Sequence, residues 1–446
     1  MLGKKLVLPA VTAILVLAVA CGGSTSNPTA GSETPTPSPT PSPTPTLTPN
    51  AGSEDRVPTM EDATKKPGRS PTPADTEPEP MVEPDPDFLT ALSSARFSTR
   101  GWKTDFSLHS VPYDEIIGGG PPRDGIAPID EPRFGDVSLG NEWLNDEEPV
   151  IFFEHNGDAR AYPLRIMTQH EIVNDVVGGI PVTVTFCPLC NSAIVFDRRL
   201  DGEVLDFGTS GNLRNSDLIM WGRQTESWWQ QFTGEAIVGS LTGKKLQFLT
   251  ATIISWEDFK VSRPEGTALD RNTGFNRSYT RSPYAGYDRV DNPPFLFDGD
   301  LDGRLLPKER VVAVELDSGE AVAFPYGILR EERVVDYSRG DHEMVIFFNP
   351  NTLSSFVDRT TLAFEEVGSS GVFNPNVDDQ RLTFRPDGDK FLDNETGSEW
   401  NIIGEAIQGP LTGTTLTPVL HGDYFWFAYG AFRPDTIVYQ GSGQGS

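Results

Sequence analysis

An internal repeat constrains the fold of this chain more than any other feature of its sequence. Residues 234–243 read GEAIVGSLTG, and residues 404–413 read GEAIQGPLTG. The similarity extends upstream and downstream, so that one copy runs from about residue 135 to 290 and the other from about 305 to 439. Because each copy carries the same pattern of elements, we predict two pseudo-symmetric halves that pack together.

Local patterns in both copies mostly favour β-strands. The stretch EPVIFFEHNGDARAYP reads as a strand, an Asn-Gly turn and a second strand. Two more predicted strands, IPVTVTF and SAIVFDRRL, flank a pair of cysteines. The stretch PLRIMTQHEIVND predicts a short helix opened by Pro163. We therefore predict an α+β fold that is predominantly β.

The N-terminus has the features of a targeting segment. Lys4 and Lys5 precede an apolar run from Leu6 to Ala20, which is followed by Cys21. The run is too short to span a bilayer comfortably, but it is typical of a signal-peptide core. We predict a lipoprotein signal peptide over residues 1–20 and lipidation of Cys21; an ordinary cleaved signal or an N-terminal anchor is the alternative. Either way, the expected location is extracytoplasmic.

The predicted location is the cell envelope, on its periplasmic or outer face, with the membrane as a partner through the lipid on Cys21. Residues 21–87 contain runs such as TPTPSPTPSPTPTLTP. Proline disfavours a helix and apolar residues are few, so we expect a disordered Pro/Thr/Ser-rich linker. The remaining residues divide into a first repeat domain, 88–300, and a second, 301–446.

The net charge of −28 limits the partners that are expected. A field of this sign repels the phosphates of nucleic acid and anionic lipid headgroups, so no nucleic-acid partner is expected. The charge does not identify the protein or small molecule that the chain would meet on the cell surface.

The pair Cys187 and Cys190, in TFCPLCNSAIVFD, is the main candidate for chemistry. A disulfide across such a small loop stabilises a fold by roughly 2 kcal/mol, against nearly 5 kcal/mol for a long loop. The pair suits metal binding or thiol redox exchange better than stapling. A strand, rather than the helix of thioredoxin-like motifs, is predicted after it, which favours a metal-binding knuckle.

One cysteine pair supplies two of the four ligands of a tetrahedral metal. His170, one short connection upstream, is the nearest imidazole, and Met220 is a candidate thioether. Two thiolates with an imidazole and a thioether favour copper, whereas water or a carboxylate as the fourth ligand suits zinc. A structural histidine and a core methionine are the alternatives for these two residues.

The second copy lacks these candidate ligands. The alignment of the copies places Phe348, Asn351, Glu332 and Phe384 near the positions of Cys187, Cys190, His170 and Met220, respectively. Residues that served only the fold would be expected in both copies. Their joint absence from the second copy favours a site that only the first copy carries.

A polar, turn-rich stretch, FGTSGNLRNSDLIMWGRQTESWWQQ, covers residues 207–231. Two arginines and a glutamate in it suit an anionic ligand. We take as candidate ligand-binding residues Arg214, Asn215, Asp217, Arg223 and Glu226. The alternative is a hydrogen-bonded loop with an internal ion pair.

Three stretches together resemble the bacterial family called domain of unknown function 3179: the segments containing HEIVND and CPLC, the 207–231 stretch, and FWFAYGAFRPDTIVY. The matching positions are His170, Glu171, Asn174, Asp175, Cys187, Pro188, Cys190, Asn215, Ser216, Asp217 and Met220. Arg433 departs from the family pattern, which tends to have histidine there. The resemblance implies an exported protein or lipoprotein, and it implies no reaction.

Three functions are compatible with these patterns. The leading hypothesis is an envelope lipoprotein whose first repeat binds one copper or zinc ion through Cys187, Cys190 and His170, with Met220 as a weak ligand. The first alternative is a thiol–disulfide oxidoreductase in which Cys187 attacks and Cys190 resolves. The second is a non-catalytic envelope binding module. Whether the chain is an enzyme stays open.

Overall fold

The computed structural model describes residues 82–356 and 365–442. The predicted signal peptide, Cys21 and most of the predicted linker lie outside these residues. Within the described parts of the chain, no helix has the length and apolar character needed to cross a membrane. Contacts between residues place all the described residues in one compact unit, so the boundary near residue 300 stays a prediction.

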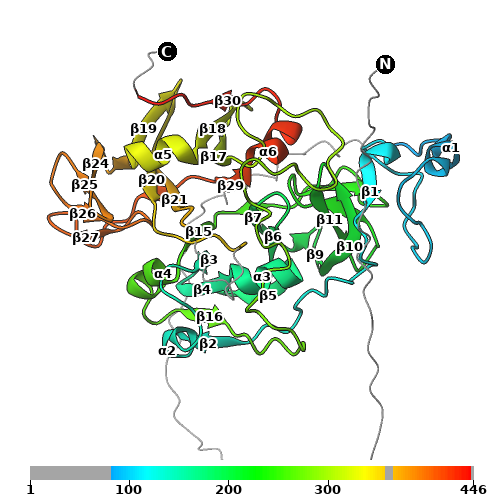
Figure 1. Cartoon of the computed structure of the whole chain (residues 1–446), viewed down its shortest axis with the longest axis horizontal. Coiled ribbons are helices and arrows are strands. Elements are labelled where there is room, and N and C mark those ends of the chain that lie inside the picture. Colours follow the sequence, from blue (N-terminus) through cyan, green and yellow to red (C-terminus); the bar gives the residue numbers. More distant parts are fainter. Residues whose placement is uncertain (1–81, 357–364, 443–446) are drawn as a thin grey trace, which may run out of the picture. The chain divides into compact units, whose positions relative to one another are not determined.

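Three larger sheets and a small ribbon form the first repeat (Figure 1). The first sheet has the order β15 (Thr252–Ser255), β3 (Pro149–His155), β4 (Asp158–Pro163), β16 (Thr267–Leu269) and β2 (Phe134–Asp136). The second has the order β14 (Phe248–Leu249), β7 (Ser192–Asp197), β6 (Ile180–Cys187) and β5 (Ile172–Val177). The third has the order β1 (Ile116–Gly118), β10 (Phe207–Arg214), β11 (Asp217–Gly222), β12 (Trp228–Gln230) and β13 (Glu235–Val238). The ribbon is β8 (Arg199–Leu200) with β9 (Glu203–Val204).

The second repeat has the same set of sheets. Its first has the order β29 (Gly422–Phe425), β17 (Arg310–Glu315), β18 (Ala321–Pro325) and β30 (Ile437–Val438). Its second has β28 (Thr417–Pro418), β21 (Ser369–Asn374), β20 (His342–Asn349) and β19 (Val334–Arg339). Its third has β24 (Phe384–Asp387), β25 (Lys390–Asp393), β26 (Glu399–Trp400) and β27 (Ala406–Gln408), and its ribbon is β22 (Asn376–Val377) with β23 (Gln380–Arg381).

Few helices accompany these strands, which confirms the predicted β-rich α+β class. They are α1 (Phe88–Ser93), α2 (Val137–Asn141), α3 (Leu164–His170), α4 (Trp256–Ser262), α5 (Tyr326–Glu332) and α6 (Trp426–Phe432), with a 3-10 turn at Tyr113–Glu115. The helix predicted after Pro163 is α3, and Pro163 is its N-cap residue. Proline suits this position because it has no amide hydrogen to leave unpaired.

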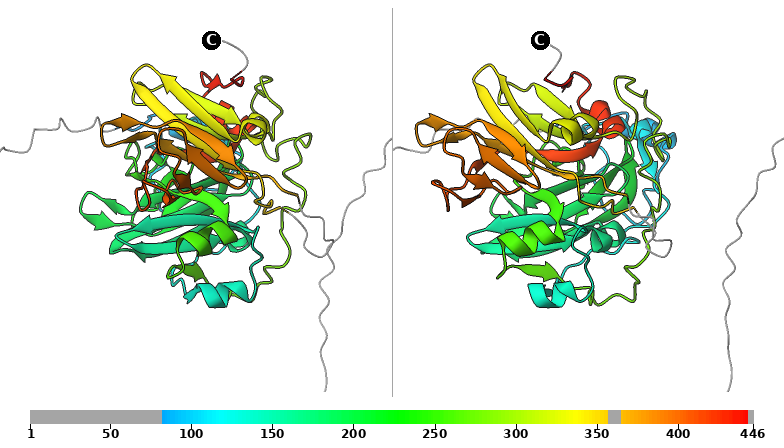
Figure 2. Two further views of the ribbon diagram at one scale, coloured as in Figure 1. Left: turned by 90° about the vertical axis from the view of Figure 1, so that its left-hand side faces the viewer. Right: turned by 60° about the vertical axis from the view of Figure 1, so that its left-hand side comes forward.

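The two repeats pack against each other, as predicted, and share their largest apolar cluster (Figures 1 and 2). Strand β7 of the first repeat lies against β29 of the second. The amide of Phe425, at the end of β29, donates to the carbonyl of Cys190 at 2.9 Å. The second repeat thus supports the backbone of the cysteine pair directly.

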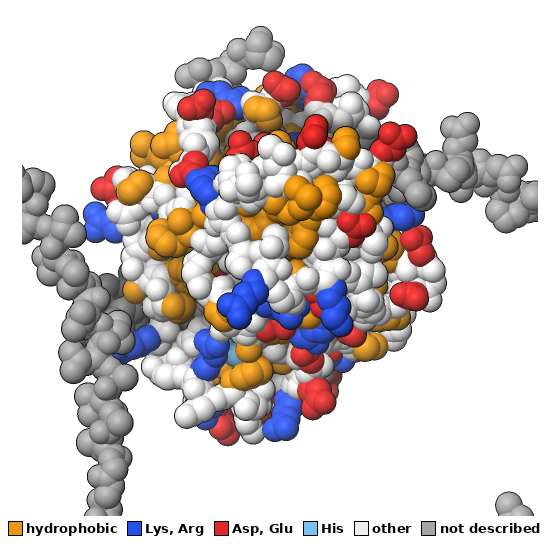
Figure 3. Space-filling model, turned by 90° about the vertical axis from the view of Figure 1, so that its right-hand side faces the viewer, with side chains coloured by type: hydrophobic (Ala, Val, Ile, Leu, Met, Phe, Trp, Pro, Cys, Tyr) orange, Lys and Arg blue, Asp and Glu red, His pale blue; other side chains and the backbone are white. Residues whose placement is uncertain are grey.

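The surface carries charges of both signs despite the large negative net charge. On the face shown in Figure 3, basic and acidic side chains lie next to one another in mixed groups. Apolar patches lie between these groups. Ion pairs between such groups occur among the described residues, for example Arg214–Glu115 at 2.6 Å.

Candidate metal centre

The cysteine pair forms a tight turn between two strands, as the sequence predicts. Cys187 is the last residue of β6, and β7 begins at Ser192. The amide of Cys190 donates to the carbonyl of Cys187 at 3.2 Å, which closes the turn. Both cysteines are buried and neither is in a disulfide. The turn therefore presents two free thiols inside the protein.

Asp217 is the group that the fold brings to these thiols. One carboxylate oxygen of Asp217 and the two sulfur atoms all lie within 4.8 Å of one another. Three further hydrogen bonds fix the position of this carboxylate: Asp217 Oδ2 accepts from Gln230 Nε2 at 2.6 Å and from the amide of Phe232 at 2.9 Å, and Oδ1 accepts from the hydroxyl of Ser192 at 3.5 Å. We define the Cys187–Cys190–Asp217 cluster as the candidate metal centre.

A strained turn places Asp217 at the start of β11. Asn215 and Ser216 join β10 to β11, and both have positive φ angles, 52° and 67°. Two such residues give a turn of the hairpin type I′. A positive φ is unfavourable for serine, and strain of this kind is often found at functional sites. Here the turn brings the carbonyl of Ser216 to 3.8 Å from the sulfur of Cys187.

A fourth acidic group, Glu171, lies beside the cluster. Its carboxyl accepts a hydrogen bond from the hydroxyl of Tyr284 at 3.2 Å. Burial raises the pKa of Glu171 to about 8, with the nearby charge of Asp217 adding to the shift. Burial likewise raises the pKa of Asp217 to about 7.

Burial also raises the pKa of both thiols, Cys190 the more strongly. No basic side chain is among the main influences on the pKa of these four acids. Within the described residues, the cluster is thus a buried set of acidic groups on whose pKa values no basic side chain has a main influence. Such groups stay protonated unless a cation from outside compensates their charge.

The segment that joins the two repeats covers the cluster. Tyr284 binds Glu171, and the hydroxyl of Tyr287 donates to the carbonyl of Leu189, within the cysteine turn, at 3.1 Å. Further along, Ser216 donates to the carbonyl of Phe295. Sequence reasoning did not select these tyrosines, because nothing in their local pattern indicates that they fold back over the first repeat.

His170 lies outside the cluster, contrary to its predicted place beside the cysteines. Its Nδ1 is 2.7 Å from the carbonyl of Ala127, and its Nε2 is 2.7 Å from the hydroxyl of Tyr279. Since a carbonyl only accepts, Nδ1 carries the proton and Nε2 accepts from Tyr279. Burial lowers the pKa of His170 to about 4. A neutral histidine with both nitrogens in use has no lone pair left for a metal.

Met220 is fully buried on β11, where it pairs with Trp229. It lies three positions after Asp217 along the strand, so alternation directs the two side chains to opposite faces. A ligand role for Met220 stays a prediction, and the strand geometry offers no support for it.

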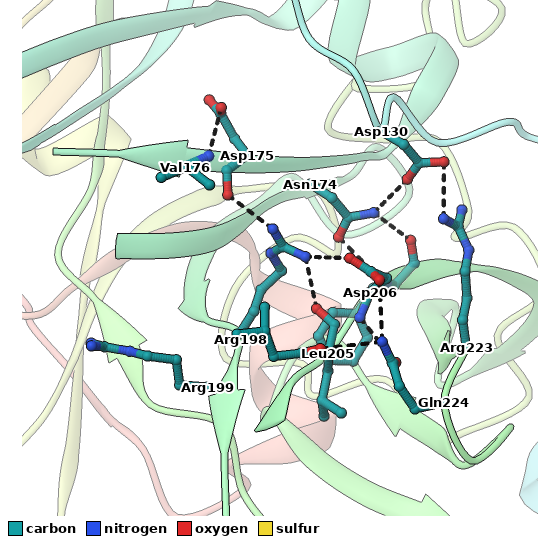
Figure 4. A network of polar contacts seen from close by, with 12 residues as sticks. Asp130, Asn174, Asp175, Val176, Arg198, Arg199, Leu205, Asp206, Arg223 and Gln224 are labelled. Atoms are coloured by element: carbon teal, nitrogen blue, oxygen red, sulfur yellow. Dashed lines mark hydrogen bonds and ion pairs between the residues drawn. The ribbon is translucent and has the colours of Figure 1, made fainter. Parts of the chain in front are cut away.

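The remaining polar residues of the 207–231 stretch have separate partners. Arg214 pairs with Glu115 at 2.6 Å, and Glu226 accepts from the amide of Lys103 at 2.7 Å. Arg223 pairs with Asp130 at 2.9 Å, and Figure 4 shows that this pair joins a network through Asn174. Asn215 belongs to the β10–β11 turn. Of the five predicted ligand-binding residues, Asp217 is therefore the one whose side chain lies beside the cysteines.

The second repeat has other residues at the positions that correspond to the candidate metal centre. Strand register pairs Ile172 with Thr185 in the first repeat and Val334 with Phe347 in the second. Cys187 therefore corresponds to Asn349, one residue from the expected Phe348. Counting back from Trp229 and Trp400, which occupy equivalent strands, matches Met220 to Phe391 rather than to Phe384.

The same count matches Asp217 to Gly388. His170 and Glu332 correspond, as predicted, since they end α3 and α5. The next residues are Glu171 and Arg333. Arg333 donates from Nε to the carbonyl of Phe348 at 2.9 Å and from Nη2 to the carbonyl of Gly388 at 3.1 Å. In the second repeat a guanidinium thus extends between the counterparts of Phe186 and Asp217.

Comparison with known proteins identifies the family. The family model described as "Protein of unknown function (DUF3179)" matches residues 123–436. The chain belongs to the DUF3179 family. The match covers both repeats and the candidate metal centre, so the centre is part of the DUF3179 region of the chain. No curated protein and no solved structure matches the chain.

Proposed function

We propose that this DUF3179 protein binds one divalent transition metal ion through Cys187, Cys190 and Asp217. Glu171 is the nearest candidate for a further ligand, through its carboxylate. Two thiolates with carboxylate oxygens are a donor set that suits zinc. The case for copper depended on an imidazole and a thioether; the cluster contains no imidazole, and strand alternation directs Met220 to the opposite face of β11 from Asp217.

The dimensions of the cluster fit such an ion. Ligand atoms bound to one tetrahedral zinc through bonds of about 2.3 Å lie roughly 3.8 Å apart. The three donor atoms already lie within 4.8 Å of one another. Small side-chain rotations would close the remaining gap, and the Asp217 carboxylate is held in place by Gln230 and Phe232.

The second repeat provides the observation that carries this proposal. Where the first repeat has four buried acids, the equivalent region of the second repeat contains the permanent cation Arg333. Loss of the cysteines and the aspartate coincides with gain of a partly buried arginine, whose charge also interacts with that of Asp389. This exchange is expected if the first repeat takes its positive charge from a bound ion.

Thiol exchange fits the same residues less well. A reactive cysteine needs an exposed sulfur and a lowered pKa. Cys187 is 2% exposed and Cys190 is fully buried, and the pKa of each thiol is raised. The Tyr287 contact with Leu189 also covers the turn. These properties support metal binding over the oxidoreductase alternative.

Metal analysis of the full-length chain, purified without chelator, tests the proposal. We expect close to one zinc per chain, and a loss of at least tenfold in the Cys187→Ser variant. The matched control is Ser369→Ala, which changes a fully buried side chain of the second repeat whose hydroxyl accepts from Thr352 at 2.9 Å and removes no ligand. Absence of metal from the wild-type chain after incubation with zinc or copper would overturn the proposal. Stoichiometric copper in place of zinc would keep the site and correct the metal.

We also propose that the protein is a lipoprotein of the cell envelope, anchored through Cys21. The support is the order of basic residues, apolar run and cysteine at the N-terminus. Radiolabelled palmitate should be incorporated by the wild-type chain and not by a Cys21→Ser variant, and the wild-type chain should fractionate with membranes. Equal labelling of both chains would contradict the proposal.

A further inference from the structure

The segment that joins the two repeats reaches from the surface of the protein to the candidate metal centre. It runs from the end of β16 at Leu269 to the start of β17 at Arg310 and contains neither a helix nor a strand. Loops of this length without secondary structure are uncommon in compact domains, and they are often functional. Contacts with Glu171 and Leu189 place part of the segment over the centre. The way in which the segment is held therefore affects access to the centre.

Two stretches of this segment are anchored to the repeats. On one side, Gln169 of α3 donates to the carbonyls of Ser278 and Arg281 at 2.8 and 3.2 Å. On the other side, Lys308 Nζ donates to the carbonyl of Tyr287 at 2.6 Å, and Lys308 is fully buried. The residues between these two stretches form a short loop whose ends are both fixed.

Tyr284 lies in this short loop and contacts the acidic groups at the centre. Its hydroxyl donates to Glu171 Oε1 at 3.2 Å, which is longer than the usual distance of about 2.7–2.8 Å for an O–H···O hydrogen bond. Among the described residues, this hydroxyl makes no other hydrogen bond. Burial raises the pKa of Tyr284, and the charges of Glu171 and Cys187 add to the shift, which agrees with a place beside the centre. One long hydrogen bond thus holds the polar end of this side chain.

Tyr284 also lies between the centre and solvent. It is partly exposed, whereas Glu171 is only 6% exposed. Within the described part of the chain, the other residues that hydrogen-bond to the acidic side chains of the centre are all buried: Ser192, Ser216, Gln230 and Phe232. Moving any of these four would disturb the packed interior. Displacing Tyr284 would uncover Glu171 without that cost.

We propose that Tyr284 is the gate of the candidate metal centre. When its hydrogen bond to Glu171 breaks, the ring moves outward with residues 282–285, and an incoming ion meets Glu171 before it reaches Cys187. The anchored stretches on either side stay in place, so opening is a local movement. The identity of the ion rests on the proposed metal binding, whereas the covering of the thiols by Tyr284 does not depend on it.

Alkylation of the metal-free, full-length chain by iodoacetamide tests the gate without a metal. Mass spectrometry of the peptide that contains Cys187 and Cys190 measures the rate. We expect slow reaction in wild type and a rate about 3- to 10-fold higher in Tyr284→Phe, which loses one hydrogen bond. Tyr284→Ala, which also loses the ring, should react faster again. Because local opening exposes little surface, these rates should rise with urea far less steeply than global unfolding does.

Tyr439→Phe is the matched control for the alkylation experiment. It removes a tyrosine hydroxyl that donates to a glutamate, Glu332, at 2.9 Å in the second repeat, and it should leave the alkylation rate unchanged. Equal rates in wild type, Tyr284→Phe and Tyr284→Ala would overturn the proposal. Rates in the two Tyr284 variants that rise with urea as steeply as global unfolding would also overturn it.

Zinc exchange distinguishes a gate from a ligand. With an excess of a chromogenic chelator, zinc should leave Tyr284→Ala at least about tenfold faster than wild type. Zinc should also bind this variant faster by a similar factor, so that the dissociation constant is nearly unchanged. Faster release with an unchanged rate of binding would make Tyr284 a support for the bound ion and overturn the gate. If the wild-type chain binds no zinc, the proposed function fails, and the alkylation rates alone decide the gate.

Discussion

Arg333 occupies in the second repeat the backbone position that Glu171 occupies in the first. Each residue follows the last residue of a helix and has a positive φ, 61° for Glu171 and 64° for Arg333. Each carbonyl accepts the amide of a phenylalanine, Phe186 at 2.8 Å and Phe348 at 2.9 Å. One fold position thus carries an acid in the first repeat, next to an acidic cluster, and a base in the second, next to backbone carbonyls and Asp389.

Glu171→Arg should convert the first repeat to the arrangement of the second. The backbone tolerates arginine at this position, as Arg333 shows. A guanidinium beside Cys187 and Asp217 would compensate their charge and exclude a metal ion from the cluster. We expect metal content to fall at least tenfold while the chain stays folded, measured by elemental analysis and circular dichroism.

Glu171→Gln is the control for this change, because it removes the carboxylate without adding a cation. It should keep the metal, with weaker affinity. If Glu171→Arg retained a full complement of metal, the compensation argument would be wrong.

Metal affinity should rise steeply with pH. The ligands bind metal only after losing their protons, and burial raises the pKa of Asp217 to about 7 and raises the pKa of both thiols. Near pH 7, binding should release roughly two protons from the thiols and a fraction of one from Asp217. Calorimetry of zinc binding in buffers of different ionisation enthalpy measures this number. Release of fewer than one proton would exclude thiolate ligands.

The metal-free protein should lose stability as the pH rises from 5 to 8. In this range Glu171 and Asp217 keep protons in the folded chain that the unfolded chain has already lost, since their folded pKa values of about 8 and 7 exceed the ordinary ones. Raising the pH removes these protons and lowers the free energy of unfolding.

The Asp217→Asn variant should reduce this loss by an amount on the order of a few kcal/mol. Asp114→Asn, at an exposed position, should leave it unchanged. Urea unfolding at several pH values in the presence of a chelator measures the effect. An identical pH dependence in Asp217→Asn and wild type would contradict the assignment.

His170→Phe should destabilise the fold without removing the metal. The variant loses the hydrogen bonds to Ala127 and Tyr279, at a cost of about 1–3 kcal/mol. Tyr279→Phe removes one of the two and should cost less. If His170→Phe lost its metal while remaining folded, His170 would be a ligand after all.

The repeated fold was predictable because its signals are local and occur twice. The Asn-Gly turn, the proline before α3 and the strands beside the cysteines each lie within a short segment, and two copies reinforce each pattern. The register was less accessible: residues 188–191 separate β6 from β7 in the first repeat, whereas in the second β20 ends at Asn349 and β21 begins at Ser369. That difference in length moved the expected partner of Cys187 from Asn349 to Phe348.

The composition of the site was only partly predictable. The cysteine spacing identified the turn, but His170 was favoured as a third ligand because it is close in sequence. Its side chain instead points to Ala127 and Tyr279, which depend on tertiary contacts that no local pattern reveals. The sequence analysis did name Asp217, but as a residue that binds an anionic ligand rather than a metal. Its closeness to the cysteines depends on the β10–β11 hairpin of the third sheet, and no local pattern reveals that tertiary contact.

X-ray absorption spectroscopy of the zinc-loaded protein tests the central claim most directly. Binding by Cys187, Cys190 and Asp217 predicts two sulfur neighbours at about 2.3 Å and oxygen neighbours at about 2.0–2.2 Å, without the outer-shell pattern of imidazole. A shell of oxygen and nitrogen alone, or a clear imidazole signal, would contradict it.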